Sequence, residues 1–149
     1  MTLRADVEAF LSEPVLAVVG ASRTGKKFGN IACRELRAKG FRVYPVHPTA
    51  DRIDGVQCYP RLADLPERVK SLLVVVPPAQ AEIVVREAAA AGVDRVWLQQ
   101  GAASASVLST CRELGLRTVA GECILMFAEP AGFHRAHRWV WKVLRKLPA

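Results

Sequence analysis

Residues 14–30 read PVLAVVGASRTGKKFGN, and this stretch decides the fold. The apolar run VLAVVG at 15–20 is short and rich in valine, as expected for a strand that is buried on both faces. A glycine-containing loop follows, and a helical pattern then begins at Gly29. A strand, a glycine loop and a helix in this order predict a phosphate-binding turn, because the loop and the helix N-terminus face the same space.

Short apolar runs and helical patterns alternate along the rest of the chain. The runs predict strands at 14–21, 41–46, 71–78, 94–99 and 116–121, with a short extra strand near Val56. Helices are predicted at 29–40, 79–92 and 104–115, and a turn or short helix after Leu62. This alternation predicts an α/β fold: a Rossmann-like three-layer sandwich whose mostly parallel sheet has about five or six strands.

Composition favours one domain spanning 1–149, because the chain has 149 residues and 51% hydrophobic content. We expect the core of this domain to span about 5–125. No apolar run approaches the roughly 18 residues of a membrane span, and the N-terminus carries acidic residues, so we expect a cytoplasmic protein. Four cysteines without a CxxC pair indicate reduced thiols, with neither a zinc site nor a disulfide framework.

The loop resembles two well-known phosphate motifs but departs from both. Gly20, Gly25 and Lys26 have P-loop spacing, yet Lys27 stands where a magnesium-binding Ser or Thr is needed, which argues against a triphosphatase. In a dinucleotide fingerprint, Ser22 would replace the second glycine, and the strand at 41–46 is followed by no carboxylate for a ribose. NAD is therefore disfavoured and NADP somewhat less so, and an NAD(P)-binding oxidoreductase or redox sensor remains the alternative.

The loop still predicts a phosphate site at the carboxyl end of the first strand. Ser22 and Thr24 supply hydroxyl donors, and Arg23, Lys26 and Lys27 supply positive charge. This charge suffices for a diphosphate and a further phosphate. In doubly wound sheets the ligand crevice lies beyond the carboxyl ends of the strands, where the winding reverses, commonly beside the first strand.

Four motifs in order carry a family resemblance that covers about residues 5–125. They are VVGASRTGKKFGNIACRELRAKGFRVYPVHP, CYPRLADLP, LLVVVPP and VWLQQGAAS. Together they resemble the small stand-alone CoA-binding proteins, whose Rossmann-like domain is similar to the N-terminal domain of the succinyl-CoA synthetase alpha subunit. The resemblance implies that the cofactor is coenzyme A or an acyl-CoA.

The resemblance also implies a set of binding residues. The loop after the first strand would meet the CoA phosphates, and the residues at the end of the second strand would line the nucleotide. The proline pair would pack against adenine, and the QQG turn would flank the pantetheine arm. Relatives often have asparagine where this chain has His47. The candidate cofactor-binding residues are Gly20, Ala21, Ser22, Arg23, Thr24, Lys26, Lys27, Phe28, Pro45, Val46, His47, Val76, Pro77, Pro78, Gln99, Gln100 and Gly101.

No catalytic constellation is readable from the sequence. The synthetase reaction runs through a phosphorylated histidine in a separate domain, for which this chain has no counterpart among His47, His134 and His137. Cys123 follows the last strand, near where a CoA thiol would arrive, but packing is the favoured role for such a cysteine. We therefore expect a carrier, sensor or regulatory module without catalysis of its own.

The C-terminal segment at about 132–147 predicts a basic amphipathic helix. Five basic residues there supply most of the net charge of +7. Such a helix docks on its own sheet or on a second subunit, and the alternative is an interaction protein that acts through this helix. The expected partner is the small-molecule CoA ligand; nucleic acid is not expected, a membrane surface is not favoured, and oligomeric state is left open.

Overall fold

The computed structural model describes residues 4–128, so the segment at 132–147 lies outside the described residues. Its main sheet has five strands in the order β2-β1-β5-β6-β7, and every neighbouring pair is parallel. The predicted Rossmann-like α/β class is therefore confirmed. The strands are β1 (Val15–Val19), β2 (Arg42–Val46), β5 (Ser71–Val74), β6 (Arg95–Leu98) and β7 (Arg117–Ala120).

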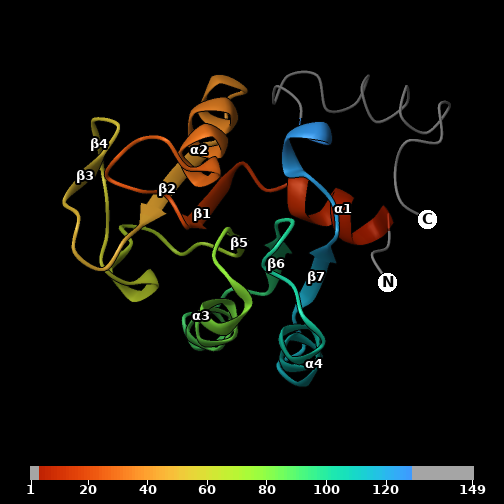
Figure 1. Cartoon of the computed structure of the whole chain (residues 1–149). Coiled ribbons are helices and arrows are strands. Elements are labelled where there is room, and N and C mark those ends of the chain that lie inside the picture. The colour runs from red at the N-terminus through yellow and green to blue at the C-terminus, as the bar shows by residue number, and fades with distance from the viewer. Residues whose placement is uncertain (1–3, 129–149) are drawn as a thin grey trace, which may run out of the picture.

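Helices cover both faces of this sheet, which gives the three layers seen in Figure 1. One face carries α1 (Arg4–Leu11) and α2 (Phe28–Ala38), and the other carries α3 (Pro78–Ala90) and α4 (Ala105–Glu113). The sequence did not predict α1, whose eight residues are held by burial of Val7, Phe10 and Leu11. Within residues 4–128, no helix is long and apolar enough to cross a membrane.

The connection from β2 to β5 contains a small hairpin instead of the single short strand expected near Val56. Its strands are β3 (Arg52–Ile53) and β4 (Val56–Gln57). The two turn residues, Asp54 and Gly55, both have positive φ, at 51° and 76°, as a two-residue type I′ turn requires. Single-turn helices follow at η1 (Leu62–Asp64) and η2 (Ile124–Met126).

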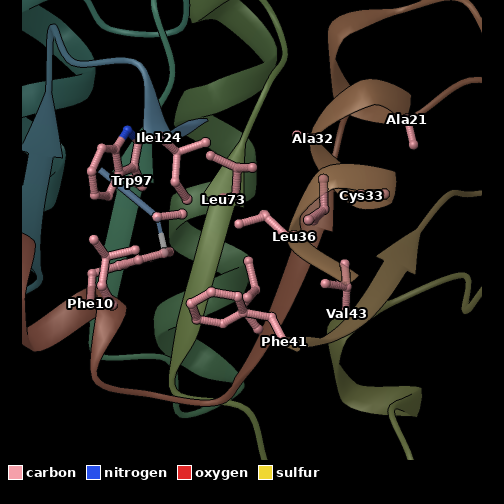
Figure 2. Packing of buried hydrophobic residues seen from close by; sticks show 14 of the residues in the cluster. Phe10, Ala21, Ala32, Cys33, Leu36, Phe41, Val43, Leu73, Trp97 and Ile124 are labelled. Atoms are coloured by element: carbon pink, nitrogen blue, oxygen red, sulfur yellow. The ribbon is translucent and has the colours of Figure 1, made fainter. Parts of the chain in front are cut away.

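Alternate residues of each strand feed two separate cores, because successive side chains point to opposite faces of the sheet. Leu16, Leu73 and Trp97 pack towards α1 and α2, and Figure 2 shows the latter two beside Ile124 and Phe10. Their neighbours in the strands, including Leu72 and Leu98, pack towards α3 and α4. The strands are therefore covered on both faces, as their continuous apolar sequences predicted.

The winding of the chain reverses between β1 and β5. From β1 the chain passes through α2 to β2 at one side, then returns across the sheet to β5 on the other side of β1. The connections after β1 and β5 leave to opposite faces, through α2 and α3 (Figure 1). This divergence leaves space at the carboxyl ends of the two strands.

Candidate ligand-binding site

A cavity of about 650 Å³ opens at the carboxyl ends of β1, β2 and β5. Its size falls within the range of small-molecule and cofactor sites. The candidate residues that line it are Gly20, Ala21, Lys27, Val46, His47, Val76 and Pro77. The wall also contains residues that were not predicted as binding residues: Val19, Pro48, Pro60, Arg61, Leu62, Val75, Gln80, Val84 and Glu87.

Gly20 allows three elements to meet at the base of the cavity. Its φ is +125°, and a Cβ there would lie 2.2 Å from the carbonyl oxygen of Val75. Gly29, in the first turn of α2, is equally constrained, because its Cβ would lie 2.5 Å from the Gly20 carbonyl oxygen. The backbones after β1 and β5 and at the start of α2 can touch only without these side chains.

Asn30 holds the loop after β1 and was not predicted. Its side chain is fully buried; Oδ1 accepts the Ser22 N–H at 2.9 Å, and Nδ2 donates to the Ser22 carbonyl at 2.8 Å. Nδ2 also donates to Asp54 at 3.1 Å, which ties the β3–β4 turn to the loop. Asn30 is therefore a positioning residue. The sequence signal for it was an asparagine directly after Gly29 at the start of a predicted helix.

The predicted hydroxyl donors of the loop are partly engaged with each other. Ser22 Oγ and Thr24 Oγ1 lie 3.0 Å apart, and Ser22 Oγ also accepts the Thr24 N–H at 3.1 Å. One of the two hydroxyls therefore donates within the loop. Within residues 4–128, the N–H groups of Ala21, Arg23 and Lys27 have no hydrogen-bond partner, so they are among the backbone donors that can face an anion.

The loop cations differ in how they are held. Arg23 donates to Thr49 Oγ1 in the turn after β2. Lys27 occupies the N-cap position of α2 without a capping hydrogen bond from its side chain, and it lines the cavity. Lys26 is absent from the cavity wall. Arg34, which the sequence analysis did not name, donates to the Gly25 carbonyl at 3.2 Å and pairs with Asp54 at 3.1 Å. The hairpin carboxylate thus offsets part of the positive charge beside the loop.

His47 stabilises the turn after β2 through its own side chain. Its Nδ1 accepts the N–H groups of Thr49 at 3.1 Å and Ala50 at 3.0 Å. In the neutral ring the proton must then lie on Nε2. Burial, and secondly the positive charge of Arg23, lower the pKa of His47 from its usual 6.5. The side chain is therefore a neutral acceptor that holds its own turn.

The two residues of the proline pair occupy different places. Pro77 lines the cavity, whereas Pro78 is the first residue of α3. Proline is well accommodated there because the first helical N–H has no partner inside the helix. Gln80, Val84 and Glu87, at helical spacing after it, complete the wall. That periodicity was the sequence signal that would have identified them.

The other candidate residues lie outside the cavity wall. Phe28 packs against the core on the α1 and α2 side, and Pro45 is buried within β2. Gln99 is 4% exposed, and its Oε1 accepts the Ile124 N–H at 3.2 Å. Gln100 and Gly101 are exposed in the turn after β6. β6 lies beside β5, so this turn is next to the cavity along the same edge of the sheet.

The four cysteines are unpaired and occupy two kinds of environment. Cys33, Cys58 and Cys111 are buried. Burial raises the pKa of the Cys33 thiol to about 11 and raises the pKa values of the other two. Cys123, after β7, is partly exposed.

Residues 15–129 match the protein family described as CoA binding domain. An ADP-forming acetate–CoA ligase II from Archaeoglobus fulgidus is 39% identical over 80 residues, which are 52% of this chain but only 12% of that ligase. The chain therefore corresponds to a small part of the curated relatives it matches.

Two solved structures resemble most of this chain. A conserved hypothetical protein from Pyrococcus furiosus is 39% identical, with a TM-score of 0.70, over 74% of this chain and 96% of its own. A Thermus thermophilus protein is 30% identical, with a TM-score of 0.73, over 83% and 94%. Both are short chains.

Proposed function

Because this chain belongs to the CoA-binding domain family, we propose that residues 1–149 form a single domain that binds coenzyme A or an acyl-CoA. The nucleotide half of the ligand occupies the cavity at the carboxyl ends of β1, β2 and β5. One observation carries this proposal: the cavity lies where the sheet winding reverses, and the Gly20 loop forms its base.

In this proposal the diphosphate lies against the loop after β1. The unpaired N–H groups of Ala21, Arg23 and Lys27 and the N-terminus of α2 supply donors and partial positive charge. Asn30 holds the loop before any ligand arrives. A prearranged loop supports binding because little conformational entropy is lost when the anion is bound.

The adenosine lies further from the loop, between apolar walls. Val46, Val76 and Pro77 supply surfaces without hydrogen-bond donors, and Leu62 and Val84 lie in the same wall. β2 is followed by His47 and Pro48, so the carboxylate that a nicotinamide dinucleotide site uses for its ribose is missing from that position. This favours CoA over NAD.

We propose a carrier, sensor or regulatory role for this chain, without catalysis of its own. The match to the acetate–CoA ligase covers only 12% of that enzyme. Within the described part of the site, Ser22 and Thr24 contact each other instead of a basic group. In the bound state the pantetheine arm runs from the loop past Gln100 and Gly101 towards β7.

Titration calorimetry with CoA, dephospho-CoA and NAD tests the function. We expect CoA to bind more tightly than dephospho-CoA by roughly tenfold or more, because one charge-assisted phosphate contact contributes about 1.5–3 kcal/mol. NAD should bind more weakly than both. A preference for NAD would overturn the assignment, and equal affinities for CoA and dephospho-CoA would remove the lysines from the site.

Single-residue variants locate the phosphates. Lys27→Ala should narrow the gap between CoA and dephospho-CoA more than Lys26→Ala, because only Lys27 lines the cavity. Arg23→Ala should weaken the binding of both ligands. An equal effect of the two lysine variants would show that the lysine charges act on the phosphate at a distance, without direct contact between Lys27 and the phosphate.

A further inference from the structure

Glu87 lies at the end of the cavity away from the phosphate loop. Gln80, Val84 and Glu87 are spaced by four and three residues, so they share one face of α3, and all three line the cavity. The loop contributes residues 20, 21 and 27 to the opposite end. Among the described residues, Glu87 is the only carboxylate in the cavity wall.

In the described part of the chain, the carboxylate of Glu87 has no cationic partner, because the arginine in the cavity wall is already paired. Arg61, also in the wall, is held by Asp64 through two hydrogen bonds of 3.0 Å. The carboxylate of Glu87, an exposed residue, makes no hydrogen bond or ion pair within residues 4–128, whereas the Glu87 carbonyl accepts the Ala91 N–H within α3. A smaller hollow of about 270 Å³ between η1 and α3 shares Arg61, Leu62 and Glu87 with the cavity. Glu87 therefore stands where the cavity continues along α3.

An ionised carboxylate is only an acceptor, so in a cavity for an anionic ligand it needs a donor on that ligand. The nucleotide half of CoA offers the exocyclic amine of adenine as such a donor. Building on the proposed function, we propose that Glu87 selects adenine over hypoxanthine by accepting a hydrogen bond from this amine. Hypoxanthine carries a carbonyl oxygen at the same position, and this oxygen would face the carboxylate without a proton between them.

Displacement titrations test this selection: calorimetry measures how tightly ADP and IDP each compete with bound CoA. The two competitors share their phosphates and ribose, so the ratio of their affinities reports on the base alone. We expect the wild-type chain to favour ADP by roughly tenfold, about the size of one charged hydrogen bond. Glu87→Gln should bring the ratio close to one, because an amide can accept from the amine or donate to the carbonyl.

Glu35→Gln is the matched control. It removes the same charge from the exposed surface of α2, away from the cavity wall, so the ADP to IDP ratio should keep its wild-type value. A wild-type ratio near one, a ratio that Glu87→Gln leaves unchanged, or failure of ADP and IDP to displace bound CoA would each overturn the role of Glu87. Failure of CoA itself to bind would instead overturn the proposed function.

Discussion

The carboxyl ends of β1 and β5 differ from those of β6 and β7, although all four strands are short and parallel. At β1 and β5 the chain leaves to opposite faces of the sheet, and a cavity remains between the departing segments. At β6 and β7 the segment after β7 lies over the strands. There Trp97 Nε1 donates to the Glu122 carbonyl at 3.0 Å, and Gln99 accepts the Ile124 N–H.

Two buried amides show what this difference means. Asn30 and Gln99 both use their side chains to hold backbone groups of a loop. Asn30 holds a loop that borders the cavity, whereas Gln99 joins β6 to the segment that covers it. Of these two amides, only the one beside diverging connections borders a cavity.

Gly20→Ala should produce the largest effect. The new Cβ would lie 2.2 Å from a backbone carbonyl oxygen, so we expect a loss of more than about 3 kcal/mol in unfolding free energy and loss of CoA binding. Gly101→Ala is the control from the other half of the edge. Its φ is +91°, but a Cβ would meet nothing within 4 Å, and the cost should be about 1–2 kcal/mol. Urea denaturation of both variants measures the difference; equal losses would contradict the close approach at Gly20.

Asn30→Ala and Gln99→Ala test whether the loop after β1 and the end of β6 differ in their importance for CoA binding. Each leaves buried backbone groups unpaired, so we expect losses of about 3 and 2 kcal/mol respectively. Only Asn30→Ala should also weaken CoA binding, by roughly tenfold, because the phosphate loop would no longer be prearranged. Calorimetry on both folded variants distinguishes them. A comparable loss of CoA affinity in Gln99→Ala would contradict this and show that Gln99 itself contributes to CoA binding.

Acidification should lower the free energy of unfolding through protonation of His47, which lines the cavity. Because its pKa in the folded protein is below 6.5, the unfolded chain takes up the proton first as the pH falls. The contribution to stability is complete above pH 6.5 and decreases below it, down to the folded pKa. His47→Asn keeps an acceptor for the Thr49 and Ala50 N–H groups but does not titrate. Thermal melts between pH 7.5 and 5 should show a smaller slope for this variant, and an unchanged slope would exclude His47 as the source.

The smallest effect is expected from thiol labelling, which tests whether the end of β7 is accessible and leaves the stability of the fold unaffected. Cys123 should react first with a thiol reagent, because the other three cysteines are buried and have raised pKa values. Mass spectrometry of peptides from the intact, partly labelled protein identifies the site. With CoA disulfide as the reagent, a mixed disulfide at Cys123 is expected if the pantetheine arm extends towards β7. First reaction at Cys33 would contradict this order.

The sheet was predictable because its signals are local. Each apolar run, with its glycine or proline boundary, indicates a buried strand without reference to the rest of the chain, and the five predicted runs became β1, β2, β5, β6 and β7. Helix α1 was not predicted because its eight residues carry only a weak pattern, and burial of Phe10 against Trp97, with ring centroids 5.4 Å apart, holds it in place.

The sequence by itself determined the parallel α/β architecture, the glycine loop at the end of β1 and the shortage of acid after β2, because these depend on neighbouring residues. Tertiary structure alone decided which polar residues face the cavity. Asn30 and Asp54 meet across 24 positions of the chain, and Glu87 of α3 lines the same cavity as Leu62 of η1. Such pairings arise from the order of strands in the sheet and the face to which each connection departs, and no local pattern encodes either.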